Sequence, residues 1–291
     1  MGFPLTWLDV FTAVPLAGNP LPVVHDADAL GEETMQRFAR ETRQSETTFV
    51  QAATVDGADY RNRIFDTRRE LPMAGHPSLG TAVAVAHRAG VERARYVQQT
   101  PAGQQLVEVE MGEDGRSARA SMLQEPAAMG PVADPAQALA AAGLSAADAH
   151  PELPPQEVST GYRHLIVPVR DADVLARCAP TYAGLEMLLQ SRGCGVLYLA
   201  AVDVELGRAQ VRGFFAEAGR SVAEDPATGS AAGPLCAYLH ERAGLDRVVV
   251  EQGLMMDRPS VLEAQIDVDR VRVSGDVVVL ATGEIELPTG S

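Results

Sequence analysis

One short segment of the chain recurs about half a chain length later, and this repeat constrains the fold more than any other feature. The sequence HPSLGTA at residues 76–82 aligns without gaps to DPATGSA at 225–231, an offset of 149 residues. The same offset places the Arg-x-Phe of residues 63–65 on that of residues 212–214. Each segment opens an Ala- and Gly-rich stretch that ends in Arg-Ala-Gly, which is a helix stop signal. An internal duplication is therefore the favoured interpretation.

Short runs of β-branched and aromatic residues predict that strands dominate both halves. The predicted strands cover residues 7–11, 21–24, 47–50, 60–65, 105–111, 117–122, 165–169, 195–201, 210–215, 248–251, 261–268, 271–273 and 277–280. Helical spacing of apolar residues predicts helices at 31–41, 135–142 and 181–190. Two more helices, the repeated ones, are expected to begin near Pro77 and Pro226.

The repeat and the Ala/Pro-rich stretch 124–135 together predict two alike domains. The first comprises residues 1–125 with the last strand from about 277 to 291, and the second comprises residues 126–276. A helix lined with alanine and glycine suits a crowded interior, such as the middle of a curled sheet. The predicted fold class is α+β, with two pseudo-symmetric domains that each curl a mostly antiparallel, barrel-like sheet around a central helix.

The chain contains no lysine, since all 24 of its cationic side chains are arginine. This excludes enzymes that need a Schiff-base lysine, a lysine-bound pyridoxal phosphate or a phosphate-binding Walker lysine. The formal net charge of −15 repels phosphate backbones, so nucleic acid is not an expected partner. The simplest interpretation of the acidity is solubility.

Neither the three cysteines nor the six histidines show a metal-binding spacing, because CxxC, HExxH and His-x3-His are all absent. No metal site is therefore expected, and the few cysteines indicate a reducing compartment. The N-terminus lacks the pattern of a signal peptide, and no apolar run reaches the roughly 18–20 residues that span a bilayer. We expect a cytoplasmic protein without a membrane partner.

The starts of the two repeated helices offer the first candidate site. Free backbone N–H groups after Gly75 and after Thr228 would attract an anion such as a substrate carboxylate. In a pseudo-symmetric pair of domains, His76 and Asp225 would then lie on opposite sides of a bound acid, an arrangement that suits proton transfer. The alternative is structural: Asp225 before Pro226 is a good helix N-cap, and a loop histidine is commonly a surface or capping residue.

Glu46 is the third candidate, because it directly precedes the predicted strand at residues 47–50. A carboxylate at the entrance of a strand is usually solvated. In a desolvated cleft, however, its pKa would rise toward the range of a general acid/base.

Five motifs, in order along the chain, resemble the phenazine-biosynthesis (PhzF-like) isomerase family. They are Leu8–Thr12 with Gly18-Asn19-Pro20, Ser45–Val50, Glu70–Pro77, Glu224–Gly233 and Gln252–Ser260. The resemblance runs from residue 8 to about residue 260, and the Asp-Pro-Ala-Thr-Gly-Ser-Ala block is its most specific part.

The resemblance implies a fold similar to that of diaminopimelate epimerase, with the site in the cleft between two alike domains. It also implies cofactor-free acid/base chemistry in which Glu46 shuttles a proton and His76 and Asp225 orient the substrate or assist. The residues that bind the substrate's polar groups would be Asn19, Gly75, Ser78, Gly229 and Ser230. In the related epimerases and racemases, the acid and base are two cysteines. Here all three cysteines lie outside both helix-start motifs, which disfavours a two-thiol racemase.

Three functions remain open at this point. The leading hypothesis is an isomerase that moves a proton within a small unsaturated carboxylic acid, of the trans-2,3-dihydro-3-hydroxyanthranilate isomerase type. The second is an epimerase or lyase of another small acid on the same scaffold, and the third is a non-catalytic protein that binds a small acid. The sequence does not distinguish one small acid from another. It also leaves open whether Arg163 or His164 lines the site and whether the protein is a homodimer.

Overall fold

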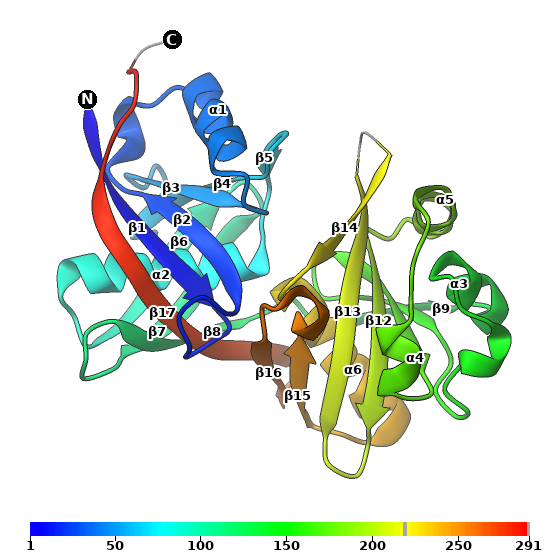
Figure 1. Ribbon diagram of the computed structural model, residues 1–291. Helices are drawn as coiled ribbons and strands as arrows, with labels where there is room; N and C mark the ends of the chain where they lie inside the picture. The colour runs from blue at the N-terminus through cyan, green and yellow to red at the C-terminus, as the bar shows by residue number, and fades with distance from the viewer. Residues whose placement is uncertain (218–219, 290–291) are drawn as a thin grey trace. The chain divides into compact units, whose positions relative to one another are not determined.

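The computed structural model describes residues 1–217 and 220–289, and the chain divides into two compact units (Figure 1). Unit 1 comprises Met1–Met122 and Ser274–Ser291, and unit 2 comprises Leu123–Val273. The chain leaves unit 1 within β8 (Ser117–Leu123) and returns to it within β17 (Arg270–Glu286). The last strand therefore completes the unit that begins the chain.

The sheet of unit 1 closes on itself. Its strands are β1 (Gly2–Val10), β2 (Asn19–Val24), β3 (Thr47–Gln51), β4 (Tyr60–Phe65), β6 (Arg93–Thr100), β7 (Gly103–Met111), β8 and β17. Each of these strands pairs with the next in that order, and β17 closes the ring because it pairs with both β8 and β1. The short strand β5 (Glu70–Leu71) pairs with β4 beside this ring. The β2–β3 and β4–β6 pairs are parallel, because the chain crosses over between them.

Helix α2 (Gly75–Ala89) runs inside this ring, since it contacts β1, β2, β3, β4, β6 and β7. Small residues make the enclosure feasible: a Cβ at Gly80 would come within 2.6 Å of Leu21 and 2.8 Å of Val10. The outer face is covered by α1 (Glu32–Thr42), whose Met35 and Ala39 belong to a core cluster with strand residues such as Phe49. A 3₁₀ turn, η1 (Ala27–Ala29), joins the same cluster.

Unit 2 is built on the same plan. Its strands are β9 (Ala128–Val132), β10 (Gln156–Ser159), β11 (Arg163–Val169), β12 (Val196–Asp203), β13 (Arg208–Glu217), β14 (Ser221–Asp225), β15 (Arg247–Gln252) and β16 (Ser260–Asp267). They pair in the order β9–β10–β11–β12–β13–β15–β16, with β14 as a hairpin on β13. The pairs β11–β12 and β13–β15 are parallel.

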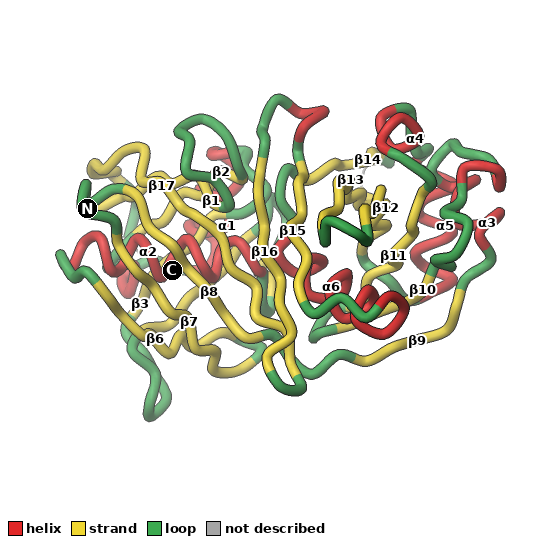
Figure 2. Tube along the Cα trace, turned by 90° about the horizontal axis from the view of Figure 1, so that it is seen from below, coloured by secondary structure: helices red, strands yellow, loops and turns green. Residues whose placement is uncertain are grey.

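Helix α6 (Gly229–Ala243) contacts β10, β11, β15 and β16, and ten of its residues are buried. Three further helices, α3 (Pro135–Ala141), α4 (Ala172–Ala176) and α5 (Tyr182–Arg192), lie together on one side of unit 2 (Figure 2). Leu139, Val174 and Leu185 of these helices share a core cluster with β11 and β12. The mixed α+β class and the curled, barrel-like sheets predicted from the sequence are confirmed.

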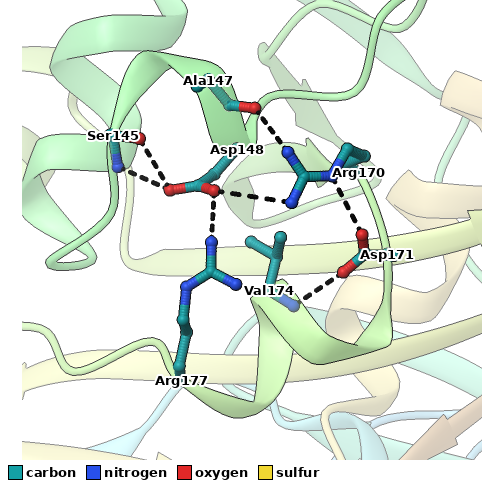
Figure 3. A network of polar contacts seen from close by, with 7 residues as sticks. All are labelled: Ser145, Ala147, Asp148, Arg170, Asp171, Val174 and Arg177. Carbon is teal, nitrogen blue, oxygen red and sulfur yellow. Dashed lines mark hydrogen bonds and ion pairs between the residues drawn. The ribbon is translucent and has the colours of Figure 1, made fainter.

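An ion-pair network fixes the 3₁₀ turn η2 (Ala146–Asp148) against β11 and α4 (Figure 3). The Asp148 carboxylate accepts hydrogen bonds of 2.9 Å from both the backbone and the hydroxyl of Ser145, which lower its pKa. It also pairs with Arg177 and, at 3.9 Å, with Arg170. Arg170 in turn donates to Asp171, the capping residue of α4. Because these groups are satisfied by one another, we assign the network a structural role.

The two units repeat one distinctive contact. In unit 1, Arg63 lies over the ring of Phe65 and donates to Glu70 at 2.8 and 2.6 Å. In unit 2, Arg212 lies over the ring of Phe214 and donates to Glu224 at 2.8 and 2.7 Å. The arginines and phenylalanines are 149 residues apart, whereas the two glutamates are 154 residues apart. The hairpin between β13 and β14 is therefore five residues longer than the hairpin between β4 and β5.

This longer hairpin corrects the alignment of the two helix starts. Helices α2 and α6 both have 15 residues and begin close to the predicted positions, at Gly75, two residues before Pro77, and at Gly229, three residues after Pro226. Asp225 is the last residue of β14, where pairing with Gly213 holds it extended, so it does not cap the helix. The counterpart of His76 is therefore the second residue of α6, Ser230. Proline is tolerated at residue 77 because the first N–H groups of a helix have no partner within it.

Candidate active site

His76 is the second residue of α2 and is 4 % exposed. Its Nδ1 lies 3.2 Å from Asn19 Nδ2, and because an amide nitrogen only donates, Nδ1 must accept. The ring proton is therefore on Nε2. Burial lowers the pKa of His76 to about 3, so the ring is neutral at pH 7. The buried Nε2 makes no hydrogen bond to the residues that the structure describes, which leaves a donor for a bound ligand or for a closer carboxylate.

Glu46 supplies that carboxylate. Its Oε2 lies 3.5 Å from His76 Nε2, and its side chain is 18 % exposed. Next to it, Ser45 donates through its hydroxyl to Asn19 Oδ1 at 3.2 Å, which fixes the amide with its nitrogen toward His76. The order Ser45, Asn19, His76 is thus a directed chain of hydrogen bonds that aims an N–H group at Glu46. A largely enclosed carboxylate beside a neutral imidazole is suited to accepting and returning a proton.

Gly75 and Ser78, two predicted substrate-binding residues, both lie in the first turn of α2 but differ in whether their hydrogen-bond donors are used. Gly75 is the buried first residue of the helix, where its backbone N–H has no acceptor within the helix. Ser78 is completely buried, and its hydroxyl donates to the carbonyl of Ala74 at 2.7 Å. That proton is used within the first turn and the hydroxyl has no exposed surface, so a role of Ser78 in substrate binding stays a prediction.

In unit 2, the loop that follows β14 is held by Gln252. Its Nε2 donates to the carbonyl of Asp225 at 2.7 Å and to Thr228 Oγ1 at 2.8 Å. Its Oε1 accepts from the Thr228 backbone at 3.1 Å and from the Tyr198 hydroxyl at 3.0 Å. Thr228 then donates through Oγ1 to Asp225 Oδ2 at 2.8 Å. The fully buried Gln252 thereby fixes the direction of the half-buried Asp225 carboxylate.

Gly229 and Ser230 form the first two positions of α6. The Gly229 carbonyl accepts from Gln124 at 2.9 Å, and Ser230 Oγ lies 3.2 Å from Nε2 of the buried His164. Arg163 points elsewhere, because it pairs with Glu157 and its side chain is 54 % exposed. Of the two residues left open by the sequence, only His164 contacts a candidate residue.

The structure therefore gathers the sequence-derived residues into two groups, one in each unit. Asn19, Glu46, Gly75 and His76 lie together in unit 1, and Asp225, Gly229 and Ser230 lie together in unit 2. Sequence reasoning missed the supporting residues Ser45, Thr228 and Gln252. The available signal was that all three lie inside the motifs that carry the family resemblance.

None of the three cysteines joins either group. All are buried, and burial raises the pKa of Cys178 to about 11 and those of Cys194 and Cys236 to about 12. Thiols that stay protonated at neutral pH are poor bases. Within residues 1–217 and 220–289, no three His, Cys, Asp or Glu side chains gather in a way that could hold a metal ion. In the same residues, no helix is both long and apolar enough to cross a membrane.

The comparisons with known proteins cover nearly the whole chain. The family model of PhzC-PhzF, described as "Phenazine biosynthesis-like protein", matches residues 8–283. A trans-2,3-dihydro-3-hydroxyanthranilate isomerase from Pseudomonas aeruginosa is 35 % identical over 289 residues, which cover 96 % of this chain and 98 % of that protein. An uncharacterized isomerase from Clostridium acetobutylicum is 29 % identical over 96 % of this chain and 97 % of its own.

Solved structures agree with this match. A protein from Pseudomonas aeruginosa described as a predicted epimerase superposes with a TM-score of 0.84 at 35 % identity, covering 97 % of this chain and 99 % of its own. A PhzF-family phenazine biosynthesis protein from Bacillus anthracis gives the same TM-score at 28 % identity, over 98 % and 99 % of the two chains. A hydroxyproline epimerase from Agrobacterium vitis shares the fold, with a TM-score of 0.65 at 12 % identity over 98 % of this chain and 91 % of its own.

Proposed function

The chain belongs to the PhzC-PhzF family of phenazine biosynthesis-like proteins and is an isomerase, and from this premise we propose that it moves a proton within a small unsaturated carboxylic acid without a cofactor. The observation that carries the proposal is the pair formed by Glu46 and the neutral, buried His76, 3.5 Å apart. A carboxylate can take a proton from one carbon and return it to another, provided that a neighbouring group holds it in place.

Glu46 is the proton-transferring group in this proposal. Its carboxylate accepts the proton from the substrate, and the N–H of His76 stabilises the charge that Glu46 carries before and after the transfer. His76 itself does not serve as the base, because burial keeps its pKa near 3 and its Nδ1 is occupied by Asn19. We propose that the backbone N–H groups at Gly75 and His76, in the first turn of α2, bind the carboxylate of the substrate.

The group in unit 2 is also suited to binding an acid. We propose that Asp225, fixed by Thr228 and Gln252, orients the substrate through its carboxylate, while the first N–H groups of α6 bind an anionic oxygen. The class of acid follows from the isomerases at 35 % identity, whose names specify trans-2,3-dihydro-3-hydroxyanthranilate.

Isomerisation of trans-2,3-dihydro-3-hydroxyanthranilate in deuterium oxide tests the proposal directly. The protein is incubated with this acid, and product and substrate are followed by proton NMR. We expect turnover with deuterium at the carbon that receives the proton, because a partly exposed carboxyl group exchanges its proton with the solvent. The absence of both turnover and exchange with this acid would reject it as the substrate.

Replacing Thr228 with valine tests the role assigned to Asp225. Valine keeps the shape of threonine but removes the hydroxyl that donates to Asp225 Oδ2 at 2.8 Å. A hydrogen bond to a charged group contributes roughly 1.5–3 kcal/mol, so we expect kcat/KM to fall by roughly 10–100-fold. The matched control is Thr228→Ser, which keeps the hydroxyl and should retain most of the activity. Equal activity of the valine and serine variants would show that this hydrogen bond does not position the carboxylate.

A further inference from the structure

His164 and Ser230 form a buried pair for which the reaction proposed above needs no role. His164 lies in β11 and is completely buried, with Nδ1 2.9 Å from the Tyr162 carbonyl oxygen and Nε2 3.2 Å from Ser230 Oγ. The ring also packs edge-on against Tyr162, at 5.3 Å between centroids. These contacts leave the imidazole a single orientation, in which both ring nitrogens are engaged.

The direction of these hydrogen bonds follows from the partners. A carbonyl oxygen only accepts, so the bond to Tyr162 requires the ring proton on Nδ1. Burial lowers the pKa of His164 to about 4, so at pH 7 the ring is neutral and carries only that one proton. Nε2 therefore presents a lone pair, and the hydroxyl of Ser230 must donate to it.

A serine hydroxyl has one proton, and here that proton is directed away from any ligand. Ser230 is partly exposed, whereas His164 has no exposed surface, so a ligand can reach Ser230 but not the histidine behind it. The side chain of Ser230 can then meet a ligand only through the remaining lone pairs of Oγ. It should accept a hydrogen bond from the ligand and should not donate one.

The equivalent position in unit 1 has the opposite polarity. His76 is the second residue of α2, as Ser230 is of α6, and Asn19 contacts His76 as His164 contacts Ser230. Because Asn19 donates to Nδ1, His76 presents a donor at Nε2. One helix start thus offers a donor side chain and the other an acceptor, although the two elements arose from the same repeat.

We propose that His164 is a positioning residue that fixes Ser230 as a hydrogen-bond acceptor, so that Ser230 Oγ selects for a hydroxyl or amino group on the bound acid. This inference rests on the proposed function for the identity of the site, but not for the geometry of the pair. It assigns the preference for a donor-bearing acid to His164, which itself does not touch the substrate.

The protonation state of His164 can be measured without any substrate. In protein labelled with ¹⁵N-histidine, we expect the signal that is lost in His164→Gln to show a protonated Nδ1 and an unprotonated Nε2 at pH 7. In Ser230→Ala, the Nε2 resonance of His164 should shift because its donor is gone, while Nδ1 changes little. Protonation of Nε2 in the parent protein, or an unchanged Nε2 in Ser230→Ala, would overturn the proposal.

The preference for a donor is tested with benzoate and 2-aminobenzoate, which differ by one amino group beside the carboxylate. A hydrogen bond contributes about 0.5–1.5 kcal/mol, so the parent should bind 2-aminobenzoate about 2–10-fold more tightly, as measured by calorimetry. His164→Leu should remove this preference, because the hydroxyl is then free to turn. His164→Gln, whose side-chain oxygen can accept from Ser230, should restore it.

Thermal unfolding confirms that each variant is folded before its affinities are compared. A folded His164→Leu protein that keeps the parent's preference would contradict the role of His164, as would a parent protein that binds both acids equally. If neither acid binds, the ¹⁵N measurement decides the proposal. Failure of the function proposed above would give a different result. The protein would then not isomerise the acid, but the His164 tautomer and the preference for 2-aminobenzoate over benzoate would be unchanged.

Discussion

Replacing Glu46 with glutamine is expected to lower kcat for isomerisation by at least about 10²–10⁴-fold, which is the usual contribution of a general base. Glutamine has nearly the same shape as glutamate and keeps an oxygen that can accept from His76 Nε2, 3.5 Å from the present carboxylate. It cannot accept the proton of the substrate. Folding and much of the substrate affinity should therefore remain, and the loss should appear in kcat, measured by steady-state kinetics on trans-2,3-dihydro-3-hydroxyanthranilate.

The matched control for this change is Glu41→Gln. Glu41 is an exposed glutamate of α1, so its replacement removes the same charge from the same unit at a solvated position. It should leave kcat and the melting temperature close to those of the parent. Near-full activity of Glu46→Gln on a substrate that the parent turns over would reject Glu46 as the proton-transferring group.

The second large effect is loss of stability at acidic pH. Three histidines are buried in the folded chain, and desolvation lowers the pKa to about 4 for His25, about 3 for His76 and about 4 for His164. In the unfolded chain each titrates near 6.5, so below that pH the unfolded state binds more protons than the folded state. Stability is therefore complete above pH 6.5 and falls as the pH decreases toward 4.

The size of this loss follows from proton linkage. Each buried histidine contributes a slope of up to about 1.4 kcal/mol per pH unit between pH 6.5 and 4. Three of them give up to about 4 kcal/mol per pH unit, a large share of the roughly 5–15 kcal/mol that stabilises a typical protein. Urea unfolding at pH 7, 6, 5.5 and 5 measures the slope, because the free energy of unfolding in water is obtained at each pH by linear extrapolation.

A pair of single variants identifies the source of the slope. His25→Gln removes a buried histidine whose Nε2 bonds only to Thr6 among the contacts described. It should reduce the slope of the unfolding free energy by up to about 1.4 kcal/mol per pH unit, the contribution of one histidine. The matched control is His240→Gln, because the side chain of His240 is half exposed and stays in contact with water in the folded state. A free energy of unfolding that stays constant from pH 7 to pH 5 would show that these histidines are not buried in neutral form.

Much of the fold could be predicted because its signals are local. The thirteen strands expected from β-branched and aromatic runs are all present, with residues 271–273 and 277–280 joined in the single strand β17. The two-residue β5 and the strands β6, β9, β10 and β14 were missed because they are short, polar or contain Gly and Pro, as in Gly130-Pro131 of β9. These segments become strands through pairing with neighbours, which a local pattern does not reveal.

The repeat shows where sequence comparison reached its limit. The gapless alignment set His76 against Asp225, because both precede a proline at the same offset. The structure sets His76 against Ser230 instead, since the Arg–Glu contacts mark an insertion of five residues in the β13–β14 hairpin. Loops accept insertions with little cost, whereas a helix start enclosed by a sheet cannot slide along it.

By itself, the sequence determined the family, the internal duplication and the α+β class, and it supplied Glu46, His76 and Asp225 as the candidates for the site. These depend on residue type and order, which the sequence states directly. Only the tertiary structure decided which ring nitrogen of His76 and of His164 carries the proton, and which side chain aims the Asp225 carboxylate. The physical reason is that the direction of a hydrogen bond is fixed by its partners. Asn19 reaches His76, and Gln252 reaches Asp225, only when the chain has folded, because each pair is far apart in the sequence.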